Sequence, residues 1–164
     1  MTVNSSRDYG HAMARALAQA KQAGLRGDVP IGAIIIDDAG SVLAAGHNER
    51  DATGDATAHA EIQAIRALSV RRGNWRLDGL TMVVTIEPCT MCAGAIVAAR
   101  LTKLVFGALE PKTGAVVSLW DVVRDRRLNH QVEVIGPWDL PARLTEPCSQ
   151  LLLDFFAERR PAAE

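Results

Sequence analysis

The sequence predicts an α/β fold, a three-layer sandwich in which helices cover both faces of a sheet. Its 164 residues have the length of one domain, so we assign residues 1–164 to a single domain. Short apolar, β-branched segments alternate along the chain with segments of helical periodicity, a pattern typical of this fold class. No internal repeat or linker divides the sequence.

The composition is that of an ordinary globular protein. Hydrophobic residues make up 48% of the chain, charged residues 23%, and the formal net charge is −1. These values exclude a disordered chain and a highly basic protein that coats nucleic acid. The first ten residues lack the apolar segment of a secretory signal, and no apolar run is long enough to span a bilayer. We therefore expect a cytoplasmic protein that does not contact a membrane.

The first part of the chain predicts a helix followed by two antiparallel strands. Apolar residues recur at helical spacing over residues 8–24, and Gly24 is placed to end that helix. Residues 29–36 are short, apolar and β-branched, which predicts a strand buried on both faces. A turn at residues 37–40 leads to an antiparallel return strand at residues 41–47.

The middle of the chain predicts a second helix and a third strand. A polar stretch at residues 48–57 separates them from the first two strands. Residues 58–68 have both the propensity and the period of a helix, which we expect to end at residues 71–73. The apolar residues 80–86 predict another buried strand.

The last part of the chain predicts two more helices and two more strands. Small apolar side chains at residues 89–99 indicate a buried helix, and residues 101–106 and 132–135 indicate strands. An apolar stripe over residues 144–156 predicts the final helix. We expect residues 136–147, which hold three prolines, to form a loop.

Two short motifs at the starts of predicted helices carry groups that bind metal. Cys89 and Cys92 are three positions apart, so both sulfurs can face one point in the first turn of a helix. His59 and Glu61 are two positions apart and converge only where a helix begins. One imidazole and two thiolates give zinc three protein ligands and leave a fourth position for water, as in catalytic zinc sites.

Glu61 and the third cysteine decide between a catalytic and a structural zinc site. Glu61 is a carboxylate beside the metal that is not needed as a ligand, and it is well placed for proton transfer. Cys148 is able in principle to complete a structural site with four ligands. It lies in an apolar helical row with Leu144 and Leu152, however, where a free cysteine behaves as a small hydrophobic residue. The catalytic interpretation is the better supported of the two.

The order His-x-Glu followed by Pro-Cys-x-x-Cys is the signature of the zinc-dependent nucleobase deaminases. Further segments make the chain resemble one branch of that superfamily, the bacterial tRNA-specific adenosine deaminases, which convert the wobble adenosine of a tRNA anticodon to inosine. The resemblance spans nearly the whole chain. It is carried by residues 29–33, 46–48, 56–62, 87–94, 106–107, 112–114, 128–130 and 154–156.

This resemblance implies a mixed five-stranded sheet between helices, a homodimer and one zinc ion per subunit. It implies that the anticodon stem-loop of a tRNA binds with its target base flipped into the zinc site. By similarity, each candidate residue has one role. His59, Cys89 and Cys92 hold zinc, Glu61 transfers protons, Asn48, the Ala60 backbone and Asn129 hold the nucleotide, Glu110 lies near the ribose, and Phe156 packs by a flanking nucleotide.

We expect hydrolytic deamination of adenosine. Zinc would lower the pKa of a bound water to about 7, and Glu61 would carry a proton from this water to N1 of the purine and then to the leaving amine. Two alternatives stay open. A small-molecule cytosine, cytidine or guanine deaminase would use the same zinc site, whereas a non-catalytic, zinc-stabilised RNA-binding module would have no use for Glu61.

Overall fold

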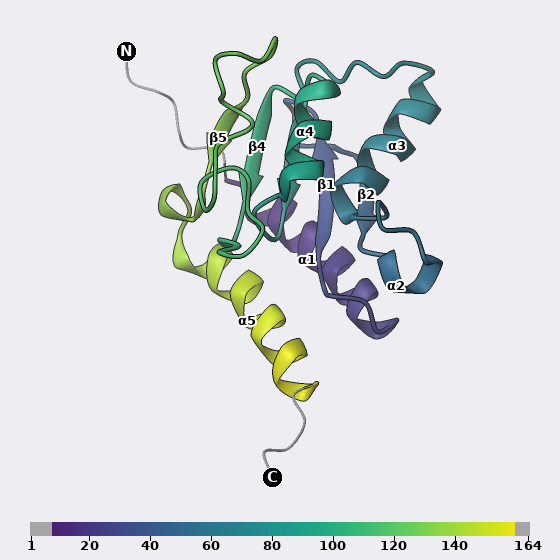
Figure 1. The fold of residues 1–164 in the computed structure, drawn as a ribbon, viewed down its shortest axis with the longest axis vertical. Helices are drawn as coiled ribbons and strands as arrows, with labels where there is room; N and C mark the ends of the chain where they lie inside the picture. Colours follow the sequence, from purple (N-terminus) through teal and green to yellow (C-terminus); the bar gives the residue numbers. More distant parts are fainter. Residues whose placement is uncertain (1–7, 160–164) are drawn as a thin grey trace.

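The computed structural model describes residues 8–159 (Figure 1). Residues 1–7, which hold most of the N-terminal segment considered above, and residues 160–164 lie outside the described part. No helix among the described residues is both long and apolar enough to cross a bilayer. In chain order the elements are α1 (Gly10–Leu25), β1 (Gly32–Ile36), β2 (Val42–His47), α2 (Arg50–Thr53), α3 (Ala60–Arg72), β3 (Thr81–Val84), α4 (Thr90–Ala98), β4 (Lys103–Phe106), β5 (Glu133–Ile135), the 3-10 helix η1 (Pro137–Asp139) and α5 (Ala142–Glu158).

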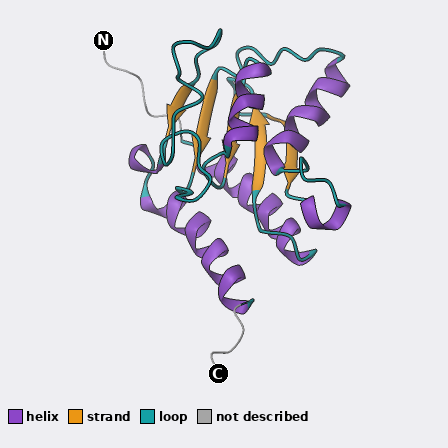
Figure 2. Ribbon diagram, viewed as in Figure 1, coloured by secondary structure: helices purple, strands orange, loops and turns teal. Residues whose placement is uncertain are grey.

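Five strands form one mixed sheet in the order β2-β1-β3-β4-β5. β1 is antiparallel to both β2 and β3, whereas β4 is parallel to β3 and to β5. The central strands β1 and β3 are buried along their whole length, as their continuous apolar sequences predict. Figure 2 shows helices on both faces of this sheet. The predicted fold class and all five predicted strands are confirmed.

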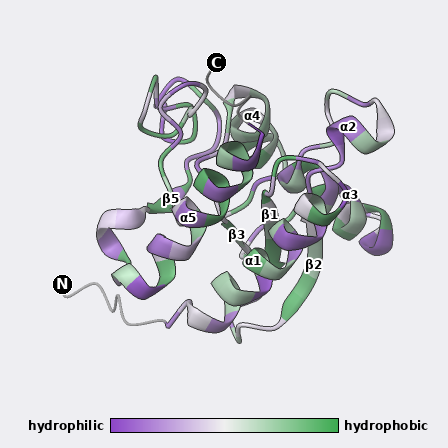
Figure 3. Cartoon of the chain, turned by 90° about the horizontal axis from the view of Figure 1, so that it is seen from below, coloured by the Kyte–Doolittle hydropathy of each residue, from purple (hydrophilic) through white to green (hydrophobic). Residues whose placement is uncertain are grey.

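Each face of the sheet has its own hydrophobic core, because alternate side chains of a strand point to opposite faces. Ile35, Met82 and Leu104 pack with α3 and α4 on one face. Ile34 and Val83 pack with α1 and α5 on the other face. Figure 3 shows β1 and β3 between α1 and α4. The sheet therefore holds α3 and α4 together on one face.

The predicted loop at residues 136–147 is wrong in its second half. Residues 137–139 form η1, and α5 begins at Ala142 with Pro147 inside the helix. Leu144 and Cys148 are both buried in the core that α5 shares with α1. Burial of this apolar face offsets the backbone hydrogen bond that proline cannot donate, so the helix begins before Pro147.

The glycine at the end of β2 is required by the close approach of α3. A Cβ atom at Gly46 would lie 2.3 Å from the carbonyl oxygen of Ala60 and 2.7 Å from the nitrogen of Ala64. An added methyl group would therefore have to push α3 away from β2. We expect Gly46→Ala to lower the free energy of unfolding by about 1–3 kcal/mol, which urea unfolding measures.

The matched control for this substitution is Gly94→Ala in α4. A Cβ atom at Gly94 meets no described atom within 4 Å, and alanine favours helix over glycine by roughly 0.5–1 kcal/mol. We therefore expect Gly94→Ala to be neutral or stabilising. Similar losses of stability in both variants would contradict the proposed contact between α3 and β2.

Candidate active site

Two predicted metal ligands occupy equivalent positions at the starts of α3 and α4. His59 is the last residue before α3 and has extended backbone angles, φ −76° and ψ 154°. Cys89 precedes α4 in the same way, with φ −72° and ψ 174°. The N-terminus of a helix carries partial positive charge, which favours thiolates. The sheet thus brings two helix N-termini to one place, as the spacing of the two motifs predicts.

The three predicted ligand side chains converge on one point. The Nδ1 atom of His59 lies 3.7 Å from Sγ of Cys89 and 3.6 Å from Sγ of Cys92. The three ligand atoms all lie within 4.8 Å of one another. Nitrogen and sulfur ligands of a tetrahedral zinc ion are about 3.6 Å apart, given the usual bond lengths. The donor set and its spacing therefore fit one zinc ion held by three residues.

The third cysteine is not part of this group. Cys148 is buried among the residues of the core between α1 and α5, and its sulfur contacts Sδ of Met13 at 3.6 Å. The ligand group among the described residues contains Cys89 and Cys92 but not Cys148. Cys148 therefore does not serve as a fourth ligand, and a group of three ligands is the one expected of a catalytic zinc site.

The pKa values of the two ligand cysteines shift in opposite directions. A hydrogen bond from Cys92, together with a weaker contribution from His59, lowers the pKa of Cys89 to about 4. The same hydrogen bond, together with burial, raises the pKa of Cys92. Because zinc is bound by thiolates, binding of the metal displaces the proton of the Cys92 thiol.

Glu61 lies in the first turn of α3, two residues after His59, and only 3% of its surface is exposed. Burial raises the pKa of Glu61 because it disfavours the charged carboxylate, and the nearby Cys89 thiolate raises it further. A raised pKa suits a carboxylate that must both accept and release a proton near neutral pH.

Asn48 is buried at the end of β2, and both ends of its amide already serve the local structure. Its Nδ2 donates to the carbonyl oxygen of Val29 at 3.2 Å, and its Oδ1 accepts from the backbone N–H of Arg50 at 3.2 Å. Each of these atoms retains the capacity for one further hydrogen bond. Asn48 therefore stabilises the local backbone and keeps hydrogen-bonding capacity for a nucleotide.

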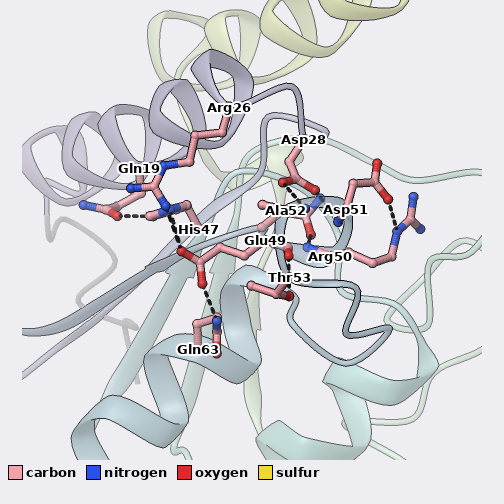
Figure 4. A network of polar contacts seen from close by, with 11 residues as sticks. Gln19, Arg26, Asp28, His47, Glu49, Arg50, Asp51, Ala52, Thr53 and Gln63 are labelled. Carbon is pink, nitrogen blue, oxygen red and sulfur yellow. Dashed lines mark hydrogen bonds and ion pairs between the residues drawn. The ribbon is translucent and has the colours of Figure 1, made fainter.

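The short helix α2 lies next to Asn48, in the polar stretch at residues 48–57. The buried carboxylate of Asp28 accepts hydrogen bonds from the backbone N–H groups of Asp51, at 2.7 Å, and Ala52, at 3.1 Å (Figure 4). Asp28 thereby acts as a cap for a helix more than twenty residues further along the chain. The neighbouring Glu49 carboxylate contacts Arg26, His47 and Gln63 (Figure 4).

Two more of the predicted nucleotide contacts lie on segments that meet the ligand group. Ala60 is the first residue of α3, so its backbone N–H is one of those that a helix leaves without an intrahelical acceptor. Glu110 is partly exposed, and its carboxylate accepts from the backbone N–H of Lys112 at 2.9 Å. Glu110 belongs to a loop whose Gly114 pairs with Cys89.

The structure does not bring Asn129 to the ligand group. The amide oxygen of Asn129 accepts a hydrogen bond from Arg100 at 3.1 Å, and Arg100 follows the C-terminus of α4, whereas Cys89 precedes its N-terminus. The same guanidinium nitrogen of Arg100 donates to the carbonyl oxygen of Val97, so Asn129 lies near the last turn of α4. Phe156 lies in the last turns of α5 with 49% of its surface exposed and its ring edge-on to Phe155.

One buried carboxylate beside the ligand group is not identified by the sequence motifs. Glu87 lies directly before Pro88 and Cys89, yet its side chain is 2% exposed and fully engaged in hydrogen bonds with distant residues. In the sequence, the only local sign of Glu87 is that a charged residue directly follows the apolar run of residues 80–86.

Comparisons with known proteins agree with this geometry. Residues 6–108 match the family described as the cytidine and deoxycytidylate deaminase zinc-binding region. Curated tRNA-specific adenosine deaminases from Bacillus subtilis (strain 168) and Haemophilus influenzae are 42% and 44% identical to the chain over 148 residues. The matches cover 90% of this chain and 88% and 83% of those proteins.

Solved structures share the fold. A structure from a study of A-to-I editing by tRNA:A34 deaminases at the wobble position has a TM-score of 0.79 and 39% identity, and the match covers 87% of this chain and 99% of that one. A guanine deaminase from Nitrosomonas europaea has a TM-score of 0.75 at 20% identity, covering 96% and 86%, a likeness of fold alone. The chain belongs to the cytidine and deoxycytidylate deaminase zinc-binding family and, within it, to the tRNA-specific adenosine deaminases.

Proposed function

We propose that this protein is a zinc-dependent hydrolase that deaminates the wobble adenosine of a tRNA anticodon to inosine. The observation that carries the chemistry is the convergence of His59, Cys89 and Cys92 within 4.8 Å at two helix N-termini. The buried Glu61 is the second residue of α3, two residues after His59. The similarity to tRNA-specific adenosine deaminases over 90% of the chain supports the choice of substrate.

The residues of the site divide the reaction between them. His59, Cys89 and Cys92 hold zinc, which supplies a water whose pKa is lowered to about 7. Glu61 accepts a proton from the water that adds to C6 of the purine and delivers it to N1. It then takes the proton of the new C6 hydroxyl group and gives it to the departing amine, so that the C6 carbonyl forms and adenosine and water become inosine and ammonia. The burial of Glu61 supports this role because burial raises the pKa of the carboxyl group, and a raised pKa suits a group that accepts and releases protons at neutral pH.

The substrate contacts that we propose lie around this group. Asn48, the backbone N–H of Ala60 and the carboxylate of Glu110 bind the target nucleotide. The exposed ring of Phe156 is available to stack on a flanking base, an interaction worth roughly 1–3 kcal/mol per base. The anticodon stem-loop is the bound partner, and the enzyme acts in the cytoplasm as a homodimer.

The test is inosine formation on an anticodon stem-loop with adenosine at the wobble position. We expect the zinc-loaded protein to convert this adenosine and to leave unchanged a matched hairpin whose only loop adenosine is at another position. Free cytidine, cytosine and guanine are assayed in parallel. Activity on a free base or nucleoside alone would contradict the proposed substrate and assign the zinc site to a small-molecule deaminase.

A further inference from the structure

The Glu87 carboxylate is the centre of a set of hydrogen bonds from one loop. Its Oε1 accepts from the backbone N–H groups of Val116 at 3.1 Å, Val117 at 2.7 Å and Ser118 at 2.8 Å. Its Oε2 accepts from the backbone N–H of Glu110 at 3.0 Å and from the hydroxyl of Ser118. All five donors lie in residues 107–118, which we call the Glu110 loop.

Backbone contacts join the same loop to the segment that carries a zinc ligand. Gly114 forms an antiparallel bridge with Cys89. The N–H of Ala115 donates to the carbonyl oxygen of Pro88 at 2.8 Å, and the N–H of Glu87 donates to that of Ala108 at 2.8 Å. The Glu110 loop therefore runs along residues 87–89 and over the start of α4.

The glycine in this loop is explained by the same carboxylate. A Cβ atom at Gly114 would lie 2.4 Å from both Cδ and Oε2 of Glu87. Only a residue without a side chain permits the loop to approach this closely. Gly114 ends the Lys112-Thr113-Gly114 motif, so the motif and Glu87 act as one structural unit.

A buried carboxylate is costly to a protein unless hydrogen bonds replace the water that it loses. Five donors satisfy Glu87, and they come from both ends of the Glu110 loop, at residue 110 and at residues 116–118. The carboxylate therefore sets the position of the loop relative to Cys89. Within the loop, Glu110 is held on two sides, because its N–H donates to Glu87 and its carboxylate accepts from Lys112.

We propose that Glu87 is a positioning residue, which holds the Glu110 loop against the zinc-ligand segment so that Glu110 faces the bound nucleotide. Glu87 touches neither zinc nor substrate in this role and acts through Glu110. The inference rests on the proposed function, since it assumes that Glu110 contacts the nucleotide.

Glu87→Gln separates the contacts of Oε1 with residues 116–118 from the contact of Oε2 with the N–H of Glu110. The amide oxygen of glutamine is able to accept from the three N–H groups of residues 116–118 in place of Oε1. Its NH2 group then faces the N–H of Glu110, and two donors cannot bond to each other. Glu87→Gln should therefore release residue 110 while most of the loop stays attached. We expect faster hydrogen–deuterium exchange at residues 107–112, with one zinc per chain retained.

The kinetic consequence is expected mainly in KM for the anticodon hairpin. An interaction made equally with the bound substrate and the transition state changes KM and leaves kcat nearly unchanged. Loss of positioning at a substrate contact lowers kcat/KM by about tenfold or more. Ser118→Ala, which removes one donor, should act in the same direction with a smaller effect, and it serves as the test variant if Glu87→Gln does not fold.

A double-mutant cycle distinguishes positioning from a general structural role. If Glu87 acts through Glu110, Glu87→Gln should change kcat/KM by no more than about twofold in a Glu110→Ala background. An equal loss in both backgrounds, or unchanged exchange in the loop, would overturn the proposal. Asp37→Asn is the matched acid-to-amide control. Asp37 accepts a hydrogen bond from the N–H of Ser41 in the turn after β1. The opposite end of β1, at Gly32, is the end that contacts Thr85 in the segment leading to Cys89.

Failure of the proposed function gives a different result. Wild-type protein that forms no inosine on the hairpin would refute the assigned reaction. Exchange in the Glu110 loop and the equilibrium affinity for the hairpin do not depend on turnover. These two measurements then decide the role of Glu87: a loss of both slow exchange and affinity in Glu87→Gln supports positioning, and a change in neither excludes it.

Discussion

Glu61→Ala is expected to lower the rate of deamination by at least about 10²–10⁴-fold while the variant keeps one zinc per chain. General acid–base groups contribute rate factors of this size. Glu61 is not among the three ligand residues, so its removal should leave the metal in place. The side chain is buried and its pKa is raised by that burial. Removing it also removes the cost of a buried carboxylate, and we expect the thermal midpoint to stay at or above that of the wild type.

Two measurements check this result, the zinc content of the purified variant and single-turnover formation of inosine. Glu61→Gln is the matched control because it keeps the volume of the side chain but cannot carry the proton. It should be nearly as inactive as Glu61→Ala if proton transfer is the role of Glu61. Loss of zinc together with activity would instead identify Glu61 as a ligand.

Cys89→Ala is expected to release zinc and to lower the thermal stability of the protein. Two of the three ligands, Cys89 directly before α4 and Cys92 in its first turn, lie at the start of that helix. Metal that binds the folded chain stabilises it by mass action. At free zinc a hundredfold above the dissociation constant, this linkage is worth about 2.7 kcal/mol. The variant should have almost no activity, since the two remaining ligands hold zinc weakly.

A chelator makes this prediction specific. Excess EDTA should lower the thermal midpoint of the wild type towards that of Cys89→Ala, and it should leave the midpoint of the variant unchanged. Cys148→Ala is the control cysteine, buried away from the ligand group, and it should bind a full equivalent of zinc. A full equivalent of zinc in Cys89→Ala would show that the ligand set is wrong.

Most helices and strands follow from local patterns in the sequence. β1 and β3 lie inside apolar runs that predict buried strands, and α3 begins within two residues of the position that periodicity predicts. The elements most affected by distant contacts are the ones that local patterns miss. α2 begins where Asp28 caps it, and α5 begins before Pro147 because Leu144 and Cys148 are buried against α1.

The same division holds at the site. The spacing of His59, Cys89 and Cys92 predicts the zinc ligands, because residue type and position in a first helical turn decide which atoms converge there. The position of Asn129 beside Arg100 depends on how the chain returns after β4, so the sequence does not predict it, and its contact with the nucleotide stays a prediction.

The sequence by itself determined the order of the five strands and of the four long helices, and it predicted the three zinc ligands and the acid beside them. These properties depend on neighbouring residues along the chain and on the chemistry of each side chain. Only the tertiary structure decided which loop covers the zinc-ligand segment and that Glu87 holds it. The hydrogen bonds from residues 110 and 116–118 to the Glu87 carboxylate join segments that meet only after the sheet has formed, so no local pattern encodes them.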